Sequence, residues 1–185
     1  VDLQQLNKAT LRETHHTPGP LNLVAVPSHT RKSVIDAWNG YHSLPLSEEA
    51  KVATTFITEW GRYRYCRAPM GFHASGDAYT RRFDDITIGQ ERVVRCIDDS
   101  LLWDEDIASA FWHAFDYIKL CADNGSIFNQ DKFQFAMENV EFAGFEVTME
   151  GYKPQKKLLS AIEGFPTPKT ITDIRSWFGL ENQLS

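Results

Sequence analysis

Two adjacent acids, Asp98 and Asp99, stand between two short apolar runs and are the residues best placed for chemistry. Like charges this close repel each other unless a cation or a proton intervenes, so the pair indicates a bound metal or a carboxyl with a raised pKa. A third acid, Asp36, ends another short apolar stretch. Magnesium prefers oxygen ligands, and carboxylates at strand ends could hold two ions roughly 4 Å apart for in-line phosphoryl transfer. Aspartate is also common in turns, and composition alone favours an exposed turn at this pair.

The elements that must position these acids are predicted to be short strands. Apolar and β-branched residues predict strands over 32–36, 93–97 and 100–103, the last two joined at the paired aspartates. Further strand-like segments are expected near Ile127 and over 51–58, 62–66, 132–136 and 140–147, with 51–58 and 62–66 forming a hairpin. The opening segment, residues 1–29, is expected to be loop-rich, with a turn at Pro18-Gly19-Pro20.

Helices are predicted where apolar residues recur at intervals of three and four, which occurs over 74–88, 107–122, 154–162 and 170–180. Thr170 or Thr172 is the expected cap of the last helix. Phe111, Trp112 and Phe115 have spacings typical of a core. The order of elements gives an α+β fold class, with a mainly antiparallel sheet backed by helices.

Composition limits the classes of protein that this chain can represent. Its 185 residues fit one domain, or one domain with a small appendage, and no run approaches the ~18 apolar residues of a membrane span. Three widely spaced cysteines fit neither a disulfide framework nor a zinc site, so an intracellular location is expected. The net charge of −6 argues against a nucleic-acid partner unless basic residues gather locally. Such a group exists at Arg62, Arg64, Arg67, Arg81 and Arg82, although a scattered solvated surface is an equal alternative.

Several sequence motifs occur in the order in which one protein family carries them. The segment 95–103, with its paired aspartates, resembles the hairpin of reverse transcriptases, and 34–42 resembles their first catalytic motif. Further segments resemble other parts of the family in the same order. They are the fingers segment (1–10), the template and nucleotide-binding motif (68–72), the palm-lysine stretch (129–135), the primer grip (140–145) and the linker with the first thumb helix (165–180). The chain is therefore similar, over essentially its whole length, to the reverse transcriptases of gypsy-type long-terminal-repeat retrotransposons.

The resemblance implies roles for individual residues. Asp36 and Asp98 would be the main metal ligands, with Asp99 beside them, for Mg²⁺ or, as a substitute, Mn²⁺. Lys132 would be the general acid for pyrophosphate, with a surface lysine as the alternative. Tyr41 would exclude a ribose 2′-hydroxyl, with a core aromatic as the alternative. Met70 and Gly71 would line the nucleotide pocket and template path, although Gly71 could equally be a turn glycine.

The resemblance also implies domains, partners and an activity. Residues 1–165 would be partial fingers and palm, and 166–185 the start of a thumb. The partners would be an RNA or DNA template with its primer and deoxynucleoside triphosphates, with no membrane, in the cytoplasm within virus-like particles or in the nucleus; the sequence leaves the oligomeric state open. Because basic fingers residues and most of the thumb are missing from the segment, we expect weak activity as an RNA-directed DNA polymerase. The alternative is a catalytically silent retroelement-derived module that serves as a binding or structural domain.

Overall fold

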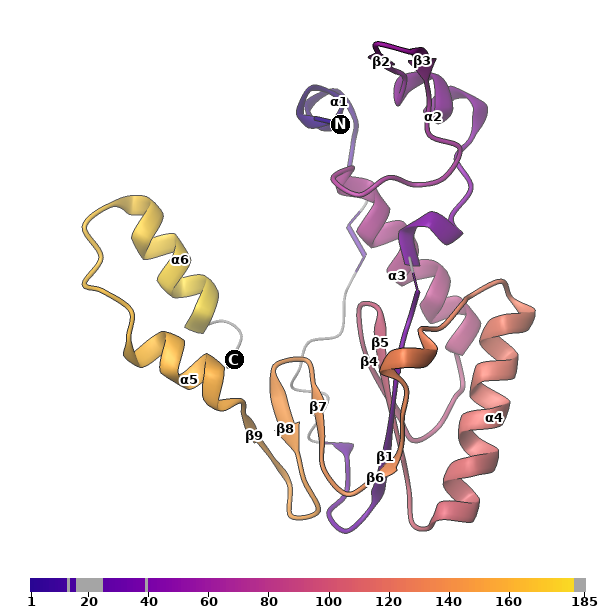
Figure 1. Cartoon of the computed structure of the whole chain (residues 1–185), viewed down its shortest axis with the longest axis vertical. Helices are drawn as coiled ribbons and strands as arrows, with labels where there is room; N and C mark the ends of the chain where they lie inside the picture. The colour runs from indigo at the N-terminus through magenta and orange to yellow at the C-terminus, as the bar shows by residue number, and fades with distance from the viewer. Residues whose placement is uncertain (13, 16–24, 39, 182–185) are drawn as a thin grey trace. The chain divides into compact units, whose positions relative to one another are not determined.

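The computed structural model describes residues 1–12, 14–15, 25–38 and 40–181, so the predicted turn at residues 18–20 lies outside the described residues. The chain divides into two compact units. Figure 1 labels the helices and strands along the chain. The first unit takes its described residues from 1–17, 37–90 and 117–129, and the second from 18–36, 91–116 and 130–185. None of the described helices is long and apolar enough to cross a membrane.

The second unit is built on an antiparallel sheet with the strand order β4-β5-β1-β6. Its strands are β1 (Arg31–Asp36), β4 (Val93–Cys96), β5 (Asp99–Asp104) and β6 (Gln134–Met137). Each of the neighbouring pairs is antiparallel. Val34, Leu101 and Trp103 belong to one apolar cluster of this unit, which fixes the strands that carry the acids. The predicted strands around the acids are confirmed, as is the α+β class with a mainly antiparallel sheet.

A three-stranded sheet follows, formed by β7 (Val140–Phe142), β8 (Phe145–Val147) and β9 (Tyr152–Pro154). The single strand predicted over 140–147 is wrong, because the chain reverses between Phe142 and Phe145. Ala143 and Gly144 both have positive φ, at 49° and 86°, which suits a two-residue hairpin turn. Alanine is not a turn signal, so the sequence pattern concealed this hairpin.

Two helices follow β9, close to their predicted positions. They are α5 (Lys156–Glu163) and α6 (Ile171–Glu181). Thr170 is confirmed as the cap of α6, because its Oγ1 accepts a hydrogen bond from the Asp173 backbone N–H at 3.1 Å. The Asp173 carboxylate in return accepts from the Thr170 N–H at 2.9 Å, so each residue satisfies a backbone donor at the start of the helix.

The first unit contains α1 (Gln4–Ala9), a 3-10 helix η2 (Gly40–Ser43), α2 (Glu48–Ala53), β2 (Phe56–Thr58), β3 (Gly61–Tyr63) and α3 (His73–Thr87). The predicted helix over 74–88 and the β2–β3 hairpin are confirmed, but two expectations fail. Residues 51–53 are helical rather than extended, because Ser47 accepts a hydrogen bond from the Ala50 N–H and starts α2. The opening segment, expected to be loop, holds α1.

The long helix α4 (Ile107–Asp123) is confirmed but presents an unexpected face. Ala110 and Ala114 are buried, as are the residues one turn further along the same face. Phe111, Trp112 and Phe115, which have core-like spacing, are instead about half exposed and pack on one another's rings. The buried side of α4 therefore combines Ala110 and Ala114 with Tyr117 and Cys121, whereas Phe111, Trp112 and Phe115 form a surface cluster.

Candidate active site

The three predicted acids are brought together by strand register. Asp36, the last residue of β1, is the antiparallel partner of Asp99, the first residue of β5. Asp99 is also the partner of Cys96 at the end of β4, so Ile97 and Asp98 form the two-residue turn between these strands. Asp98 and Asp99 are both partly buried rather than exposed. The structure therefore places all three carboxylates at one edge of the sheet.

The surroundings of these acids oppose their negative charge. Burial, and then the charge of Asp36, raises the pKa of Asp98. Burial, a hydrogen bond with Asp36 and the neighbouring carboxylates raise the pKa of Asp99 to about 6. Burial and the charges of Asp99 and Asp98 also raise the pKa of the Cys96 thiol. A proton or a cation at this edge would relieve the repulsion.

Strain is concentrated in the turn that carries Asp98. Ile97 has a φ of 54°, a region in which a β-branched side chain is an outlier, and its side chain is 43% exposed. Such a conformation costs on the order of 1–3 kcal/mol and persists only where the surrounding structure enforces it. The pairing of β4 with β5 imposes this backbone path beside the acids.

Replacing Ile97 with glycine should therefore stabilise the fold by about 1 kcal/mol, the strain released less the extra freedom of glycine in the unfolded chain. Urea unfolding of the Ile97→Gly variant measures this difference. Ile57→Gly is the matched control, because Ile57 is an exposed residue of β2 without a positive φ and its replacement should be destabilising. A lower urea midpoint for Ile97→Gly would contradict the assignment of strain.

Lys132 reaches the acids from a distant part of the sequence. It ends the 3-10 helix η3 (Gln130–Lys132), and its Nζ donates to Oδ2 of Asp36 at 2.9 Å. That hydrogen bond, with the charge of Asp36, raises the pKa of Lys132, so the ammonium form is favoured. Asp36, Asp99 and Lys132 also line a hollow of about 360 Å³.

Two acids in the wall of this hollow were not singled out from the sequence. Asp131 precedes Lys132, and Glu141 is the central residue of β7. The alternation of buried Val140 and Phe142 around exposed Glu141 is a signal that could have placed Glu141 on the open face of its strand. The hollow therefore carries more negative charge than the three predicted acids supply.

The donor chemistry of the site fits a divalent cation, although its present arrangement does not form a metal cage. Among the described residues, no group of three or more His, Cys, Asp or Glu side chains is arranged to hold an ion. Within the same residues, Oδ1 of Asp98 is buried without a hydrogen-bond partner. Carboxylate oxygens are the ligands that Mg²⁺ and Mn²⁺ prefer, and a cation would satisfy this atom and lower the raised pKa values.

The remaining predicted residues lie in the first unit. Tyr41, in η2, is partly buried and meets the Tyr79 ring edge-on, with centroids 5.8 Å apart. Met70 is 62% exposed. Gly71 has a φ of 84°, a conformation that favours glycine. This supports the interpretation of Gly71 as a turn glycine and leaves a role in binding open. Asn7 of α1, which the sequence did not single out, fixes this turn: its Nδ2 donates to the Gly71 carbonyl at 2.8 Å and its Oδ1 accepts from the His73 N–H at 3.0 Å.

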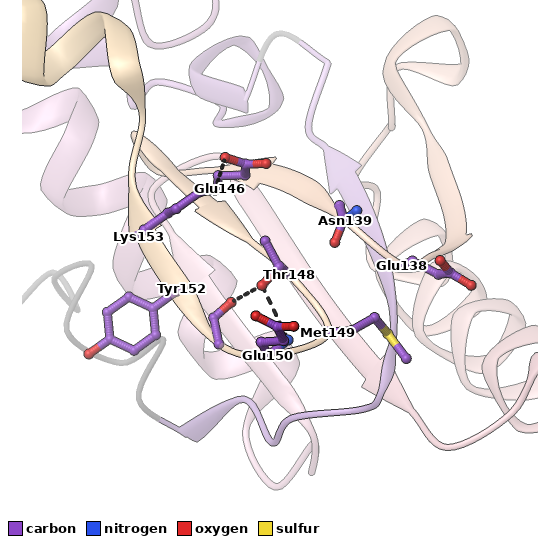
Figure 2. A pocket seen from close by; sticks show the side chains of 9 residues that line it. Glu138, Asn139, Glu146, Thr148, Met149, Glu150, Tyr152 and Lys153 are labelled. Carbon is purple, nitrogen blue, oxygen red and sulfur yellow. Dashed lines mark hydrogen bonds and ion pairs between the residues drawn. The ribbon is translucent and has the colours of Figure 1, made fainter.

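A second hollow in the second unit, of about 580 Å³, lies around the turn between β8 and β9 (Figure 2). Acidic side chains and Lys153 line it, with Glu146 and Lys153 paired at 3.2 Å. Lys32 is fully buried, and its Nζ donates to the carbonyls of Thr30 at 2.8 Å and of two residues that line the hollow, Glu138 at 3.3 Å and Thr148 at 2.7 Å. Burial lowers the pKa of Lys32. The lysine thus ties β1 to two turns, and the hollow includes none of the predicted site residues.

Replacing Lys32 with methionine should lower the free energy of unfolding by about 2 kcal/mol, because the carbonyl oxygens lose their shared donor while the volume is kept. Chemical denaturation of the Lys32→Met variant measures the loss. Lys153→Met is the matched control, since the Lys153 side chain is 60% exposed and its ion pair should contribute little. Equal stability of the two variants would show that the buried hydrogen bonds do not support the fold.

Comparisons with known proteins bear on this geometry. The family model described as reverse transcriptase (RNA-dependent DNA polymerase) matches residues 1–147. The chain is 28% identical over 184 residues to the retrovirus-related Pol polyprotein from transposon gypsy of Drosophila melanogaster, covering 97% of this chain and 18% of that protein. It is 27% identical over 185 residues to the corresponding polyprotein from transposon opus of the same species, with the same coverage. The chain thus spans less than a fifth of the length of these relatives.

Solved structures show the same fold. The foamy viral protease-reverse transcriptase dRH in complex with double-stranded DNA matches with a TM-score of 0.85 and 23% identity, over 98% of this chain and 32% of that one. The same viral protein in complex with an RNA/DNA hybrid matches with a TM-score of 0.81 and 22% identity, over 98% of this chain and 25% of that one. The family model and the polyproteins confirm the family resemblance drawn from the motifs, and these structures confirm the fold.

Proposed function

This chain belongs to the reverse transcriptase (RNA-dependent DNA polymerase) family, and we propose that it carries the catalytic centre of an RNA-directed DNA polymerase. The reaction joins a deoxynucleoside triphosphate to a primer 3′-hydroxyl and releases pyrophosphate. The observation that carries the proposal is the convergence of Asp36, Asp98 and Asp99 at one sheet edge, where their surroundings favour a cation. The foamy viral complexes with an RNA/DNA hybrid and with double-stranded DNA support a template–primer duplex as the partner.

The three aspartates would act as metal ligands. Asp36 ends β1 and Asp98 lies in the turn between β4 and β5; these two would be the main ligands, and Asp99 would support them from the register position opposite Asp36. Magnesium, or manganese in its place, would supply positive charge that favours the attacking oxyanion of the primer and the leaving pyrophosphate. The family's general use of divalent ions and the unpartnered buried oxygen of Asp98 support this assignment.

Lys132 would supply a proton to the leaving pyrophosphate. Its ammonium form is favoured by Asp36, so Nζ holds a proton at the site before the reaction. Tyr41 would exclude a ribose 2′-hydroxyl through the bulk of its ring, and Met70 and Gly71 would line the path of the nucleotide and template. We place the fingers and palm in residues 1–165 and the start of the thumb in 166–185.

Primer extension on an RNA template tests the proposal. The wild-type chain is assayed with Mg²⁺ and then with Mn²⁺, and the double variant Asp98→Asn, Asp99→Asn is the blank. Incorporation that disappears in the double variant is the expected result. Absence of incorporation by a folded wild-type chain would instead favour the catalytically silent module.

A further inference from the structure

A hollow of about 370 Å³ in the first unit contains none of the residues assigned to catalysis. Its walls combine cationic, aromatic and aliphatic side chains with a turn glycine: Trp38, His42, Ser43, Arg67, Gly125 and Ile127. Arg82 of α3 also reaches it, because its Nη2 lies 3.5 Å from the position that a Cβ on Gly125 would take. The lining residues include no carboxylate.

Two guanidinium groups converge here on a single oxygen atom. Arg67 and Arg82 each donate from Nη1 to the Ser43 carbonyl, both at 3.1 Å. The two cationic nitrogens therefore lie at most twice that distance apart. Like charges at such a separation repel, so a negative charge placed between them would be favoured.

The described part of the chain supplies no acid for either group. Elsewhere arginines pair with carboxylates, as Arg12 does with Asp77 and Arg92 with Asp104, whereas no described Asp or Glu lies within ion-pair distance of Arg67 or Arg82. Each guanidinium has five N–H donors, and most of those on Arg67 and Arg82 are not used within the described residues.

Helix ends explain part of this arrangement. Ser43 ends η2, and the Asn124 carbonyl, which accepts from Nη2 of Arg82 at 2.7 Å, follows the end of α4. The C-terminus of a helix carries at most about half a negative charge, so these ends attract two arginines without neutralising them. A bound anion would supply the rest.

An exposed flat ring completes the site. Trp38 is 52% exposed and Ile127 is 67% exposed, and a hydrogen bond of 2.7 Å from the Trp38 N–H to the Ile127 carbonyl ties their backbones together. The exposed imidazole of His42 offers a further N–H donor. A half-exposed indole beside forked donors suits a planar ring joined to an anion.

We propose that this hollow binds a phosphate group attached to a planar base, with Arg67, Arg82 and His42 on the phosphate and Trp38 against the base. The ligand is a free nucleotide or one unit of a nucleic-acid strand, which share this chemistry. The site goes beyond the proposed polymerase centre, because its residues are different and its occupancy requires no metal.

Binding is measured in EDTA, so that no metal ion held by Asp36, Asp98 and Asp99 can bind the phosphate of a probe. The measurement also does not depend on polymerase activity, so a folded but catalytically inactive chain still tests the site. Calorimetry with pyrophosphate and with dAMP covers the free ligands, and fluorescence anisotropy with a labelled single-stranded oligonucleotide covers the strand. For each probe that binds, we expect Arg67→Gln to lower the affinity about tenfold, which is the effect of losing one charge-assisted hydrogen bond. For the oligonucleotide it should also reduce the slope of log affinity against log salt by about 0.7.

The matched control is Lys8→Gln, which removes the same charge from an exposed position in α1 of the same unit. Trp38→Leu should lower the affinity for dAMP and leave the affinity for pyrophosphate unchanged.

Binding by dAMP alone would identify a free nucleotide as the ligand, and binding by the oligonucleotide with the reduced salt slope would identify a nucleic-acid strand. Equal losses in Lys8→Gln and Arg67→Gln, an unchanged dAMP affinity in Trp38→Leu, or no binding by any probe would overturn the proposal. Thermal melting confirms that each variant is folded, and Arg67→Gln avoids the added contact of Arg82 with Asn124.

Discussion

Replacing Asp98 with asparagine should reduce primer extension at least about 10³-fold, since a ligand-bound metal contributes several kcal/mol and each factor of ten corresponds to 1.36 kcal/mol. Asn keeps the size of the side chain but loses the negative charge that a cation would require. The loss should appear in the rate of single-nucleotide incorporation at saturating primer–template and nucleotide. It should persist with Mn²⁺, because the missing ligand is the same for both ions.

The same substitution should not harm the fold. Without a cation the Asp98 carboxylate is partly buried, faces the charge of Asp36 and has one oxygen without a hydrogen-bond partner among the described residues. Removing the charge removes that repulsion, so the metal-free variant should be as stable as the wild type or more stable. Opposite signs for activity and stability are typical of a residue kept for function.

Asp116→Asn is the control for both measurements. Asp116 is an exposed acid on α4 of the second unit, so its replacement changes the net charge equally while leaving the sheet edge intact. It should change neither incorporation nor stability appreciably. An Asp98→Asn variant that retains a tenth of wild-type activity would remove Asp98 from the ligand set.

The metal-free protein should lose stability as the pH rises from about 4 to 7, because of Asp99. The pKa of Asp99 is about 6 in the folded chain against an ordinary value of 3.8, so the folded state binds the proton more tightly. This contribution to stability is fully present below pH 3.8 and is lost as the pH rises through about 6. After discounting for solvent screening of this partly exposed group, we expect a loss of about 1–2 kcal/mol.

Urea unfolding in EDTA at pH 4.5 and 7.5 measures this loss, and the difference between wild type and Asp99→Asn isolates it from other titrating groups. The variant should lack this component of the pH dependence. Adding Mg²⁺ at pH 7.5 should restore stability to the wild type, since a cation favours the ionised carboxyls, and should do less for the variant. A pH profile that Asp99→Asn does not alter would show that Asp99 titrates normally.

Local patterns in the sequence determined much of the fold. Helical spacing predicted α4 within one residue of its end, and the cap at Thr170 follows from hydrogen bonds within four residues. The strand that ends at Asp36 was also evident, as was the strand predicted over 100–103, which begins one residue earlier, because each is a short apolar run. Such features depend on neighbouring residues, so the sequence displays them directly.

Other features of the fold depended on tertiary packing, which decides which side chains are buried together. The turn at Ala143 and Gly144 has no strong turn signal and arises where β7 pairs with β8. The aromatic face of α4 has the spacing of a core but lies at the surface, because Ala110 and Ala114 occupy the buried side. Periodicity indicates that a helix has two faces, and packing decides which one is buried.

The sequence alone determined the fold class and most of the strands and helices, and its resemblance to a family suggested which three acids and one lysine would perform phosphoryl transfer. The tertiary structure decided that Asp36 lies opposite Asp99 and that Lys132, 96 residues from Asp36, pairs with it. It also decided that Arg67 and Arg82 meet at the Ser43 carbonyl. Strand register and long-range convergence depend on residues distant in the sequence, so no local pattern specifies them.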